Sequence, residues 1–562
     1  MPALSPKDLP KLARTIRYLQ PEQFWHRARL RTLRRLLRAN PERFERRWGS
    51  RPDPSWEWPS DFTPIEARVD RQADSASQYA HGIFSFVGER HELGSPPEWN
   101  PAERTQLFRY NLHYFDWAWS FVQSAARVSA RTDFGRLWTS WRSFTVFGRW
   151  DEWSPYVVSL RAWNLCAVFD TLVKGTKVEA DVRASLALHA GFLKVNLERD
   201  VGGNHLIKNL KALIGLGVFL NDDAVIELAL GHLTGQIPTQ VLPDGGHFER
   251  SPAYHAQVLA DLIDCSTLLD QSGRRHAELD EPIQRMRQWL ANMMMPDGDI
   301  ALFGDSWLLG PQLIAALHLP TPSSAALVHL AESGYVVARV RSGTVLIADV
   351  GAPCPRELPA HGQAGCLSFV LSVNGERVII DTGTSTYIGP RRSYERSTRA
   401  HSTVVIDDTD QSEVWGSFRV GRRANPEVHS VSDVDGVITI DASHDGYRHL
   451  PGRPIHRRTF VINQHSISIA ERFEGTGAHR IEGSFIFDPI QAVSPDGSQL
   501  ELSTGITFSL EDDGGNWTVE TAAVSTAFGV TEPTKVARCH RTATFPTNTR
   551  VQILLPTAGP RP

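Results

Sequence analysis

The chain has 562 residues, too many for one hydrophobic core and enough for two or three domains. It contains 41% hydrophobic and 22% charged residues with a formal net charge of −4, which is typical of a folded globular protein and gives no reason to expect a nucleic-acid partner. The longest apolar runs, such as residues 213–220, are far shorter than a membrane span, and the N-terminus lacks the apolar core of a secretory signal. From these features we expect a cytoplasmic protein without a transmembrane segment.

The charge is unevenly distributed along the chain. Residues 1–50 carry 13 Lys and Arg against 4 Asp and Glu, so the remainder is acidic. We predict a basic, helical N-terminal extension over residues 1–95. Its favoured interpretation is a solvated helix packed on the main body, and the alternative is a basic amphipathic surface that touches a membrane or an acidic polymer.

Residues 96–324 show the apolar spacing of helices, interrupted by short Gly, Pro and Asp breaks. We predict helices near residues 103–130, 134–147, 155–173, 179–197, 204–220, 223–238, 252–271 and 277–294. No strand-like alternation of any length interrupts them. Such a succession of antiparallel helix pairs is typical of a bundle, a solenoid or a closed toroid of helical hairpins.

From residue 325 to residue 562 the pattern changes to short alternating or β-branched segments. We predict strands at 335–340, 344–350, 367–373, 377–380, 403–406, 437–440, 458–463, 466–471, 481–487 and 550–555. Asn374-Gly375 lies between two of them and is typical of a tight hairpin turn. Many strands without intervening helices indicate an antiparallel β-sandwich, so the chain as a whole is multidomain, α then β.

Polar groups stand at the beginning of two predicted helices. Asn204 and His205 follow two glycines and precede an apolar helical run. Ser251 is the predicted N-cap of the helix that carries Tyr254. The unpaired N–H groups and the helix dipole at such ends favour an anion. An amide, an imidazole and a phenol in these positions indicate proton transfer on a negatively charged substrate.

Several long motifs follow one another along residues 95–420. They are PPEWNPAERTQLFRYNLHYFDW (96–117), WSPYVVSLRAWN (153–164), GGNHLIKN (202–209), LPDGGHFERSPAYH (242–255), HGQAGCLSFVLSVNGERVIIDTGTSTY (361–387) and RSTRAHSTVVIDDTDQ (396–411). In this combination the chain resembles the heparinase II/III family of polysaccharide lyases. The resemblance implies an incomplete (α/α) toroid over 96–324, an antiparallel β-sandwich over 325–562, and an active cleft between them. It also implies a periplasmic location, in contrast to the cytoplasmic one that the N-terminus indicates.

Members of this family cleave uronic-acid polysaccharides by β-elimination. The reaction needs a group that neutralises the uronate carboxylate, a base that removes the C5 proton, and an acid that protonates the departing oxygen. By resemblance, Asn204 binds the carboxylate, Tyr254 is the acid, either Tyr254 or His205 is the base, and His361 completes the site from the sandwich. Because an unperturbed phenol has a pKa of about 10, we expect the helix N-terminus and nearby positive charge to lower the pKa of Tyr254.

Five further polar residues are weaker candidates for substrate contact: Tyr110, His113, Arg161, Asn164 and His255. Glu249 and Arg250 are interpreted as a structural ion pair beside the site. Each of the four catalytic candidates also has a purely structural interpretation: Asn204 as an N-cap, His205 as a polar first-turn residue, Tyr254 as a core residue with a satisfied hydroxyl, and His361 as a surface histidine in a Gly-rich loop.

Family members can hold a zinc ion in the β domain through the second His of an HGH motif, an Asp and a later His. Asp381 and His401 match the last two positions, but Gln363 stands at the first, and glutamine is a poor zinc ligand compared with imidazole. The five cysteines are scattered without a CxxC pair and indicate no thiolate metal site. We therefore expect no required cofactor, with Asp381 and His401 as a hydrogen-bonded pair and zinc as the less favoured alternative.

Three functions are compatible with these features. The leading hypothesis is a lyase acting on an acidic polysaccharide, such as a glycosaminoglycan, alginate or a bacterial exopolysaccharide. A glycoside hydrolase would need two carboxylates flanking the bond, and the candidates form no compelling pair: Asp244, Glu249, Asp299 and Asp305. The third is a non-catalytic carbohydrate-binding or exopolysaccharide biosynthesis accessory protein, which the altered HGQAG motif keeps open.

Overall fold

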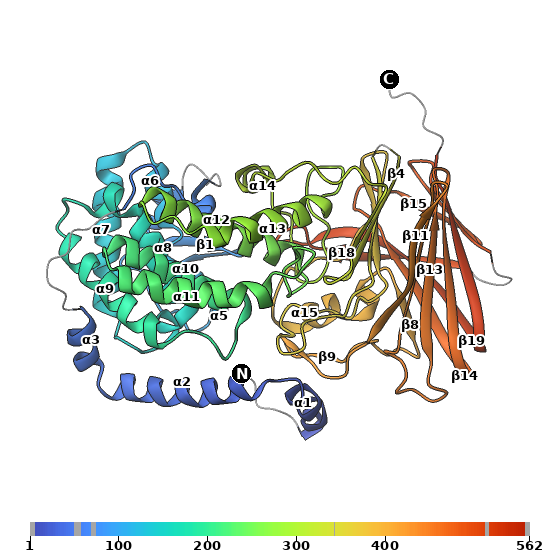
Figure 1. Cartoon of the computed structure of the whole chain (residues 1–562), viewed down its shortest axis with the longest axis horizontal. Coiled ribbons are helices and arrows are strands. Elements are labelled where there is room, and N and C mark those ends of the chain that lie inside the picture. Colours follow the sequence, from blue (N-terminus) through green and yellow to red (C-terminus); the bar gives the residue numbers. More distant parts are fainter. Residues whose placement is uncertain (1–5, 50–57, 69–74, 342, 512–515, 557–562) are drawn as a thin grey trace.

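The computed structural model describes residues 6–49, 58–68, 75–341, 343–511 and 516–556. A helical half and a β half lie next to each other along the longest dimension, and the N-terminal helices run beneath them (Figure 1). This arrangement confirms the predicted fold class, in which a helical region is followed by an antiparallel β domain.

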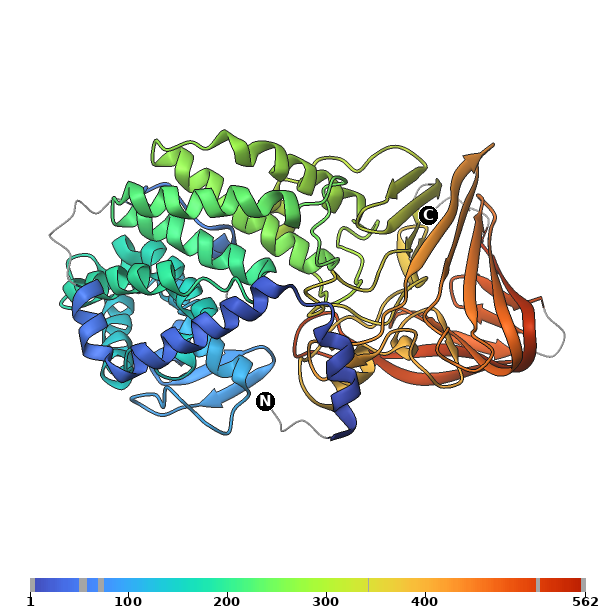
Figure 2. The ribbon, with the colours of Figure 1, turned by 60° about the horizontal axis from the view of Figure 1, so that its bottom comes forward.

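The N-terminal part begins as helix and ends as a β-hairpin. Its elements are α1 (Leu9–Ile16), α2 (Pro21–Ala39), α3 (Pro41–Gly49), α4 (Ser75–Ala80), β1 (Ile83–Phe86) and β2 (Glu89–Glu92). The extension predicted as helical over residues 1–95 therefore also contains two antiparallel strands. Figure 2 shows α2 passing along the helical half and α1 lying against the β half.

The helical half consists of α5 (Gln106–Tyr114), α6 (Ala118–Gln123), α7 (Arg127–Phe144), α8 (Pro155–Val168), α9 (Glu179–Val195), α10 (Gly203–Phe219), α11 (Asp223–Gln240), α12 (Pro252–Gln271), α13 (Asp280–Asn292) and α14 (Pro311–Leu317). The predictions from residue 155 onward agree with these helices to within a few residues. The single helix predicted over 103–130 is wrong, because Phe115 ends α5 in the left-handed region with φ of 60°. Its buried ring packs on Trp117 and Trp141 at centroid distances of 4.7 and 5.1 Å, so tertiary packing overrides the local pattern.

One helical stretch, Pro155–Val173, has the length and composition of a membrane span. Within its most apolar window, however, 72% of the residues are buried inside the protein. A core helix of a globular domain passes the same test. No other helix in the described part of the chain is long and apolar enough to pass it.

Two large antiparallel sheets make up most of the described part of the β half. One has the order β3-β4-β5-β6-β7 and consists of β3 (Leu327–Leu330), β4 (Tyr335–Arg341), β5 (Thr344–Asp349), β6 (Phe369–Val373) and β7 (Glu376–Ile379). The other has the order β11-β12-β13-β14-β19-β17-β16-β15, with β8 beside β14 and β18 beside β19. Its strands are β8 (Val404–Ile406), β11 (Pro426–Val434), β12 (Val437–His444), β13 (Ile455–Ile462), β14 (Ser466–Ile486), β15 (Val493–Asp496), β16 (Gln499–Leu502), β17 (Thr507–Leu510), β18 (Trp517–Val524) and β19 (Glu532–Leu554).

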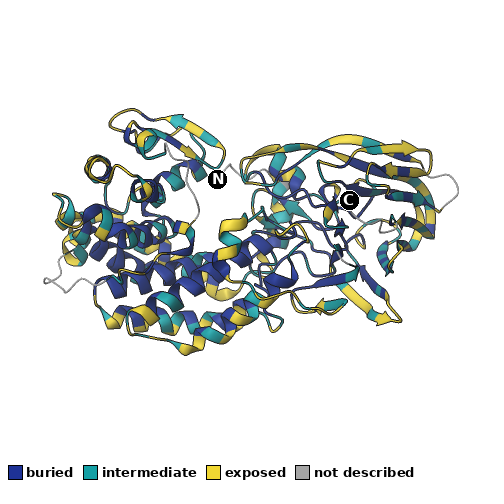
Figure 3. Ribbon diagram, turned by 90° about the horizontal axis from the view of Figure 1, so that it is seen from above, coloured by how far each residue is buried: buried dark blue, intermediate teal, exposed yellow. Residues whose placement is uncertain are grey.

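The two sheets share one hydrophobic core, as a sandwich requires. Leu346 and Phe369 from the first sheet pack in the same buried cluster as Ile440 and Phe460 from the second. Buried residues are concentrated along the ribbon at the centre of the helical half and where the two halves meet (Figure 3). Figure 1 shows α15 (Gly389–Glu395) and β9 (Val414–Trp415) between the helices and the large sheets, and β9 forms a short hairpin with β10 (Arg419–Val420).

The strand predictions at 335–340, 344–350, 367–373, 377–380 and 403–406 agree with β4 to β8 to within two residues, whereas several later ones are too short. Val373 pairs with Glu376 across Asn374-Gly375, whose φ angles are 54° and 93°, as a type I′ turn requires. The strands predicted at 466–471 and 481–487 are parts of the single strand β14. A register shift between Phe473 and Gly477 interrupts the side-chain alternation there, which is why the sequence pattern separates them.

Candidate active site

The first turn of α10 is built around the carboxylate of Glu249. Gly203 has φ of 53°, and a Cβ at this position would lie 2.3 Å from Glu249 Oε1 and 2.5 Å from Leu358 Cδ2. Because glycine lacks this atom, Glu249 can accept a hydrogen bond from the backbone N–H of Asn204 at 2.8 Å. The second glycine of the GGNH motif thus allows a carboxylate to reach the positive end of the helix.

The first turn of α12 is satisfied by hydroxyl groups. Ser251 Oγ accepts a hydrogen bond from the Tyr254 N–H at 3.2 Å, which confirms the predicted N-cap. Ser306 Oγ accepts another from the Ala253 N–H at 3.3 Å. We expected the backbone N–H groups at the two helix starts to bind an anionic ligand. The structure corrects this for Asn204, Ala253 and Tyr254, because their N–H groups already donate to Glu249, Ser306 and Ser251.

His361 lies between two carboxylates that come from different segments of the helical half. Its Nε2 is 3.1 Å from Glu249 Oε2, and its Nδ1 is 3.0 Å from Asp305 Oδ2. The guanidinium of Arg392 donates two hydrogen bonds to Asp305, at 2.5 and 2.7 Å. Both ring nitrogens of His361 therefore face carboxylate oxygens of the helical half. We refer to Glu249, Tyr254, Asp305, His361 and Arg392 as the interface cluster.

Asp305 connects the two halves of the molecule. Burial by itself would raise the pKa of this carboxyl, but the charges and hydrogen bonds of Arg392 and His361 hold it well below its usual value. Gln363 Nε2 and Thr384 Oγ1 also donate to Asp305 Oδ1, at 2.9 and 3.2 Å. Asp305 is thus a permanently ionised centre that orients residues of the β half.

Tyr254 brings α12 into contact with the β half. Its ring stacks on His361 with the centroids 3.6 Å apart, and its hydroxyl lies 2.5 Å from the hydroxyl of Tyr387. Burial, followed by the neighbouring Tyr387, raises the pKa of Tyr254 well above its usual value. The predicted lowering of this pKa is wrong, because burial of the phenol outweighs the helix N-terminus and the nearby positive charge. The phenol is neutral and suited to donating a proton.

Asn204 and His205 differ in their access to solvent. The His205 side chain is 36% exposed, and its ring lies 4.3 Å from that of Tyr156. Burial by itself would lower the pKa of His205, but Glu198, 3.3 Å from Nδ1, raises it above its usual value together with more distant acids. Asn204 is buried and donates from Nδ2 to Gln257 Oε1 at 3.4 Å. His205 is therefore the accessible proton acceptor of the pair.

Arg161 and His113, both predicted to contact substrate, lie in the core of the helical half. Both are fully buried. The Arg161 guanidinium donates to the backbone carbonyls of His113 and Glu152 at 3.2 and 2.9 Å, and it also contacts His189 Nε2 at 3.3 Å. We refer to His113, Glu152, Arg161 and His189 as the core cluster. Substrate contact is corrected for Arg161 and His113, because protein groups surround both side chains.

Asn164 and His255 are also held by protein partners. Asn164 Oδ1 accepts from Trp119 Nε1 at 3.0 Å, and Asn164 Nδ2 donates to the Tyr114 carbonyl at 3.1 Å. His255 is fully buried, with Nδ1 accepting from the His247 N–H at 3.1 Å. Their predicted substrate contacts are corrected for the same reason. Tyr110 is half-buried and stays a predicted contact.

The structure also separates the predicted ion pair of Glu249 and Arg250. Glu249 faces the α10 start and His361, whereas Arg250 donates to the carbonyls of Ala352 and Glu332 at 2.7 and 3.3 Å. Tyr387 and Arg392 belong to the site environment but were not predicted from the sequence. Tyr387 is the last residue of the motif over 361–387, so the family resemblance could have identified it as a site residue. Arg392 pairs with Asp305 across 87 residues of sequence, and such a distant pair leaves no local pattern.

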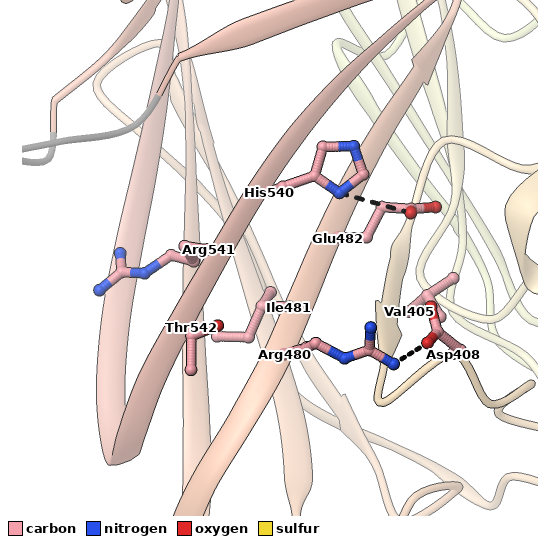
Figure 4. A pocket seen from close by; sticks show the side chains of 8 residues that line it. All are labelled: Val405, Asp408, Arg480, Ile481, Glu482, His540, Arg541 and Thr542. Carbon is pink, nitrogen blue, oxygen red and sulfur yellow. Dashed lines mark hydrogen bonds and ion pairs between the residues drawn. The ribbon is translucent and has the colours of Figure 1, made fainter.

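A cavity of about 320 Å3 lies elsewhere, on the β half (Figure 4). It is lined by Val405, Asp408, Arg480, Ile481, Glu482, His540, Arg541 and Thr542. Arg480 pairs with Asp408, and His540 Nδ1 lies 3.5 Å from Glu482 Oε2. This cavity contains none of the predicted site residues.

Comparison with family models matches both halves of the chain. Residues 98–317 match "Heparinase II/III N-terminus", and residues 322–554 match "Heparinase II/III-like, C-terminal". Together these matches cover far more than half of the 562 residues. The chain belongs to the heparinase II/III family.

Two curated relatives of this heparinase II/III protein carry different kinds of name. FtsZ-localized protein C of Caulobacter vibrioides is 28% identical over 398 residues, which are 68% of this chain and 67% of the relative. Heparin-sulfate lyase of Pedobacter heparinus is 22% identical over 408 residues, which are 63% of this chain and 60% of the relative. The chain therefore spans about two thirds of the length of these relatives.

Solved structures agree with the fold of the heparinase II/III protein. A crystal structure of heparinase III superimposes with a TM-score of 0.75 and 14% identity, covering 96% of this chain and 94% of that chain. A heparan sulfate lyase HepC mutant from Pedobacter heparinus gives a TM-score of 0.63 and 17% identity, with coverages of 92% and 88%. At these identities the likeness establishes the fold, an incomplete (α/α) toroid followed by a β-sandwich.

The donor set expected for zinc in this family is incomplete. His401 Nδ1 lies 2.8 Å from Asp381 Oδ2, and the two form a buried pair. Gln363 turns its amide nitrogen to Asp305 and offers only an amide oxygen, a poor zinc ligand. No group of three or more His, Cys, Asp or Glu in the described residues is arranged to hold a metal ion. Gln363 Oε1, Asp381 Oδ1 and His401 Nε2 are buried without a hydrogen-bond partner. With an amide oxygen in place of an imidazole these donors suit zinc poorly, and the absence of a zinc requirement stays a prediction.

Proposed function

We propose that the heparinase II/III protein is a polysaccharide lyase that cleaves a uronic-acid-containing acidic polysaccharide by β-elimination. Family membership and the names of the heparin-sulfate lyase relatives support the class of reaction. The observation that carries the proposal is the stack of Tyr254 on His361 at 3.6 Å. This stack brings the phenol of α12 against an imidazole of the β half, at the boundary where the family resemblance implies the active cleft.

In this proposal the interface cluster stabilises negative charge on the uronate. His361 is held as a cation by Glu249 and Asp305, and Arg392 holds Asp305 in turn. Asn204 supplies an amide at the same end of the site, since Glu249 links its backbone N–H to His361. A cation and an amide whose orientation is set before the reaction starts favour the enolate-like intermediate, because it carries more negative charge than the ground-state carboxylate.

Proton transfer is divided between two residues. Tyr254 is the acid, because its raised pKa keeps the phenol protonated until the departing glycosidic oxygen develops negative charge. His205 is the base, because it is 36% exposed and hydrogen-bonded through Nδ1 to Glu198, which leaves Nε2 for the substrate. The elimination breaks the C5–H bond and the C4–O bond, and forms the C4–C5 double bond of an unsaturated uronate.

A glycoside hydrolase fits the site less well. Such an enzyme needs a carboxylic acid with a raised pKa opposite a second carboxylate. Asp305 has a lowered pKa and is bound by Arg392, while Glu249 is bound to the α10 start. Asp299 accepts hydrogen bonds from the N–H groups of Leu309 and Gly310, both at 2.9 Å, and thereby organises a turn. These carboxylates are thus engaged in holding the structure.

A second candidate function is a non-catalytic role in carbohydrate binding or polysaccharide biosynthesis. The observation in its favour is the relative named FtsZ-localized protein C, whose name describes a location and no reaction. The hydrogen bond between Tyr254 and Tyr387 is compatible with it, since a phenol engaged by a protein partner must be released before it can act on a substrate.

A panel of uronate polymers distinguishes these functions. The full chain is incubated with heparan sulfate, chondroitin sulfate, alginate and a bacterial exopolysaccharide, and both near-ultraviolet absorbance and reducing ends are followed. The lyase proposal predicts that both signals rise together on at least one polymer. Reducing ends without absorbance would indicate hydrolysis, and binding without either signal would indicate the non-catalytic role.

A further inference from the structure

The N-terminal extension touches both halves of the molecule beside the candidate site. Gln23, in the first turn of α2, donates from Nε2 to the Asp200 carbonyl at 3.2 Å and to the Glu357 carbonyl at 3.5 Å. Asp200 immediately precedes the segment that carries Asn204, and Glu357 immediately precedes the loop that carries His361. The start of α2 therefore lies where these two site-bearing segments approach each other.

The extension is fixed to the β half by α1. Arg14 forms a bidentate ion pair with Glu413, with hydrogen bonds of 2.7 and 2.5 Å. Trp415 Nε1 donates to Thr15 Oγ1 at 3.1 Å. These contacts span about 400 residues of sequence and hold α1 in place, so α2 has a defined position over the body. Figure 2 shows the resulting path from one half to the other.

The inner face of α2 carries two arginines between apolar or buried positions. Gln23, Arg27, Leu30, Arg34 and Leu37 are spaced by four, three, four and three residues, which puts them on one side of the helix. Gln23, Leu30 and Leu37 are buried against the body. Arg27 and Arg34 are half-buried on this same side. A helix that only needed to cover the body would gain more from apolar side chains at these two positions.

Neither inner arginine is held by a strong protein partner. Arg27 Nε is 3.8 Å from Asp200 Oδ2, and the Arg27 side chain is 39% exposed, so this pair contributes little. In the part of the chain that the structure describes, Arg34 has no hydrogen bond or ion pair. Arg34 lies close enough to Tyr110 for its charge to oppose the rise in pKa that burial imposes on that phenol. Tyr110 is the predicted substrate contact that the structure leaves half-buried.

We propose that Arg27 and Arg34 form a binding subsite for the acidic polysaccharide, supplied by the N-terminal extension outside both regions matched by the family models. The inference rests on the proposed function, in which the substrate is a polymer of negative charge. The two guanidinium groups lie seven residues apart, about 10 Å along the helix axis, and are suited to two carboxylate or sulfate groups of one chain. The subsite lies beyond the bond that is cleaved, so it contributes to the binding of long polymers and not to that of the shortest fragment.

The test compares two double variants of the full chain with the same change in charge. Arg27→Ala with Arg34→Ala removes the inner pair, and Arg31→Ala with Arg35→Ala removes an exposed pair of the same helix. Affinity for heparan sulfate and alginate is measured by electrophoresis through gels that contain each polymer. For a polymer that is cleaved, KM and kcat are measured on the long chain and on its shortest cleaved fragment.

The variant that lacks Arg27 and Arg34 is expected to bind the preferred polymer about tenfold more weakly at low salt. This loss of affinity is about that of one charge-assisted hydrogen bond. The KM of this variant for the long polymer rises by the same factor, while kcat and the values for the shortest fragment stay unchanged. The difference decreases as salt is added. The outer variant binds like the unmodified protein, and both variants unfold at the same temperature.

Equal polymer binding by the inner and outer variants would overturn the subsite. So would an equal loss of activity on the long polymer and on its shortest fragment, because that pattern indicates a structural role for the arginines. Since binding is measured without turnover, a protein that cleaves none of the polymers refutes the lyase proposal alone, and the subsite is still judged by the gels.

Discussion

The core cluster and the interface cluster have similar compositions and different surroundings. Each is buried and combines histidine, arginine and a carboxylate. In the core cluster, burial dominates and lowers the pKa of His113 to about 3 and that of Arg161 to about 9. In the interface cluster, Arg392 and His361 instead stabilise the charge of Asp305 and lower its pKa.

The difference shows that residue type and burial do not by themselves identify a catalytic site. Arg161 lies over the rings of Trp141 and Trp153, at 4.7 and 5.6 Å, and donates to backbone carbonyls of the same half. Asp305 and His361 come from different halves and pair at their boundary. The charges of the interface cluster are compensated across the boundary between the two halves, whereas the polar groups of the core cluster are used for packing within one half.

The largest predicted effect is the loss of elimination in Tyr254→Phe. Removing the proposed acid while keeping the ring on His361 should reduce kcat by about 10²–10⁴-fold with little change in stability. Tyr447→Phe is the matched control, since its hydroxyl donates to the Val404 carbonyl at 2.6 Å within the β half. Near-normal turnover of Tyr254→Phe on a cleaved polymer would reject Tyr254 as the acid.

Asp305→Asn tests the charge compensation in the interface cluster. The substitution leaves the Arg392 charge buried without its carboxylate partner, so the free energy of unfolding should fall by about 3–5 kcal/mol. Activity should also fall, because His361 loses its orientation. Denaturant unfolding measured beside initial rates checks both effects, and an unchanged midpoint would show that the carboxylate charge is unimportant there.

Arg161→Met tests the opposite assignment for the core cluster. Loss of the hydrogen bonds from a charged group should reduce the free energy of unfolding by about 1.5–3 kcal/mol, while kcat/KM per folded molecule stays the same. A selective rise in KM with unchanged stability would restore the original prediction that Arg161 contacts the substrate.

The pH dependence of activity tests His205 as the base. Its pKa is raised above about 6.5, and a base must be neutral to accept a proton, so kcat/KM should increase with pH through a midpoint above that value. Glu198→Gln removes the main charge that raises this pKa and should move the midpoint to lower pH. A midpoint that does not move in Glu198→Gln would contradict the assignment.

The smallest predicted effect concerns metal. Because Gln363 stands in the expected zinc position, the purified protein should contain much less than one zinc per chain, and a chelator should change neither activity nor the unfolding temperature. Elemental analysis decides the point. Stoichiometric zinc that is lost together with stability would show that Asp381 and His401 bind a metal despite the altered motif.

Local patterns in the sequence predicted much of this structure. The apolar spacing that begins beside Asn204 and the Ser-Pro start beside Tyr254 identify the two helices that position these residues. His113 and Arg161 were assigned to substrate contact because the sequence pattern of a helix does not show whether a polar side chain faces a cleft or the packed core. The pairing of Asp305 with Arg392 joins distant segments and becomes visible only when the two halves are assembled.

The most direct test of the lyase assignment is the composition of the product formed in heavy-oxygen water. The full chain is incubated with a uronate polymer that it cleaves or binds, and the fragments are analysed by mass spectrometry. Elimination predicts fragments that lack one water relative to hydrolysis, carry an unsaturated uronate and contain no oxygen from the solvent. Fragments that retain the water and incorporate solvent oxygen at the new end, or no fragments from any uronate polymer, would contradict the account.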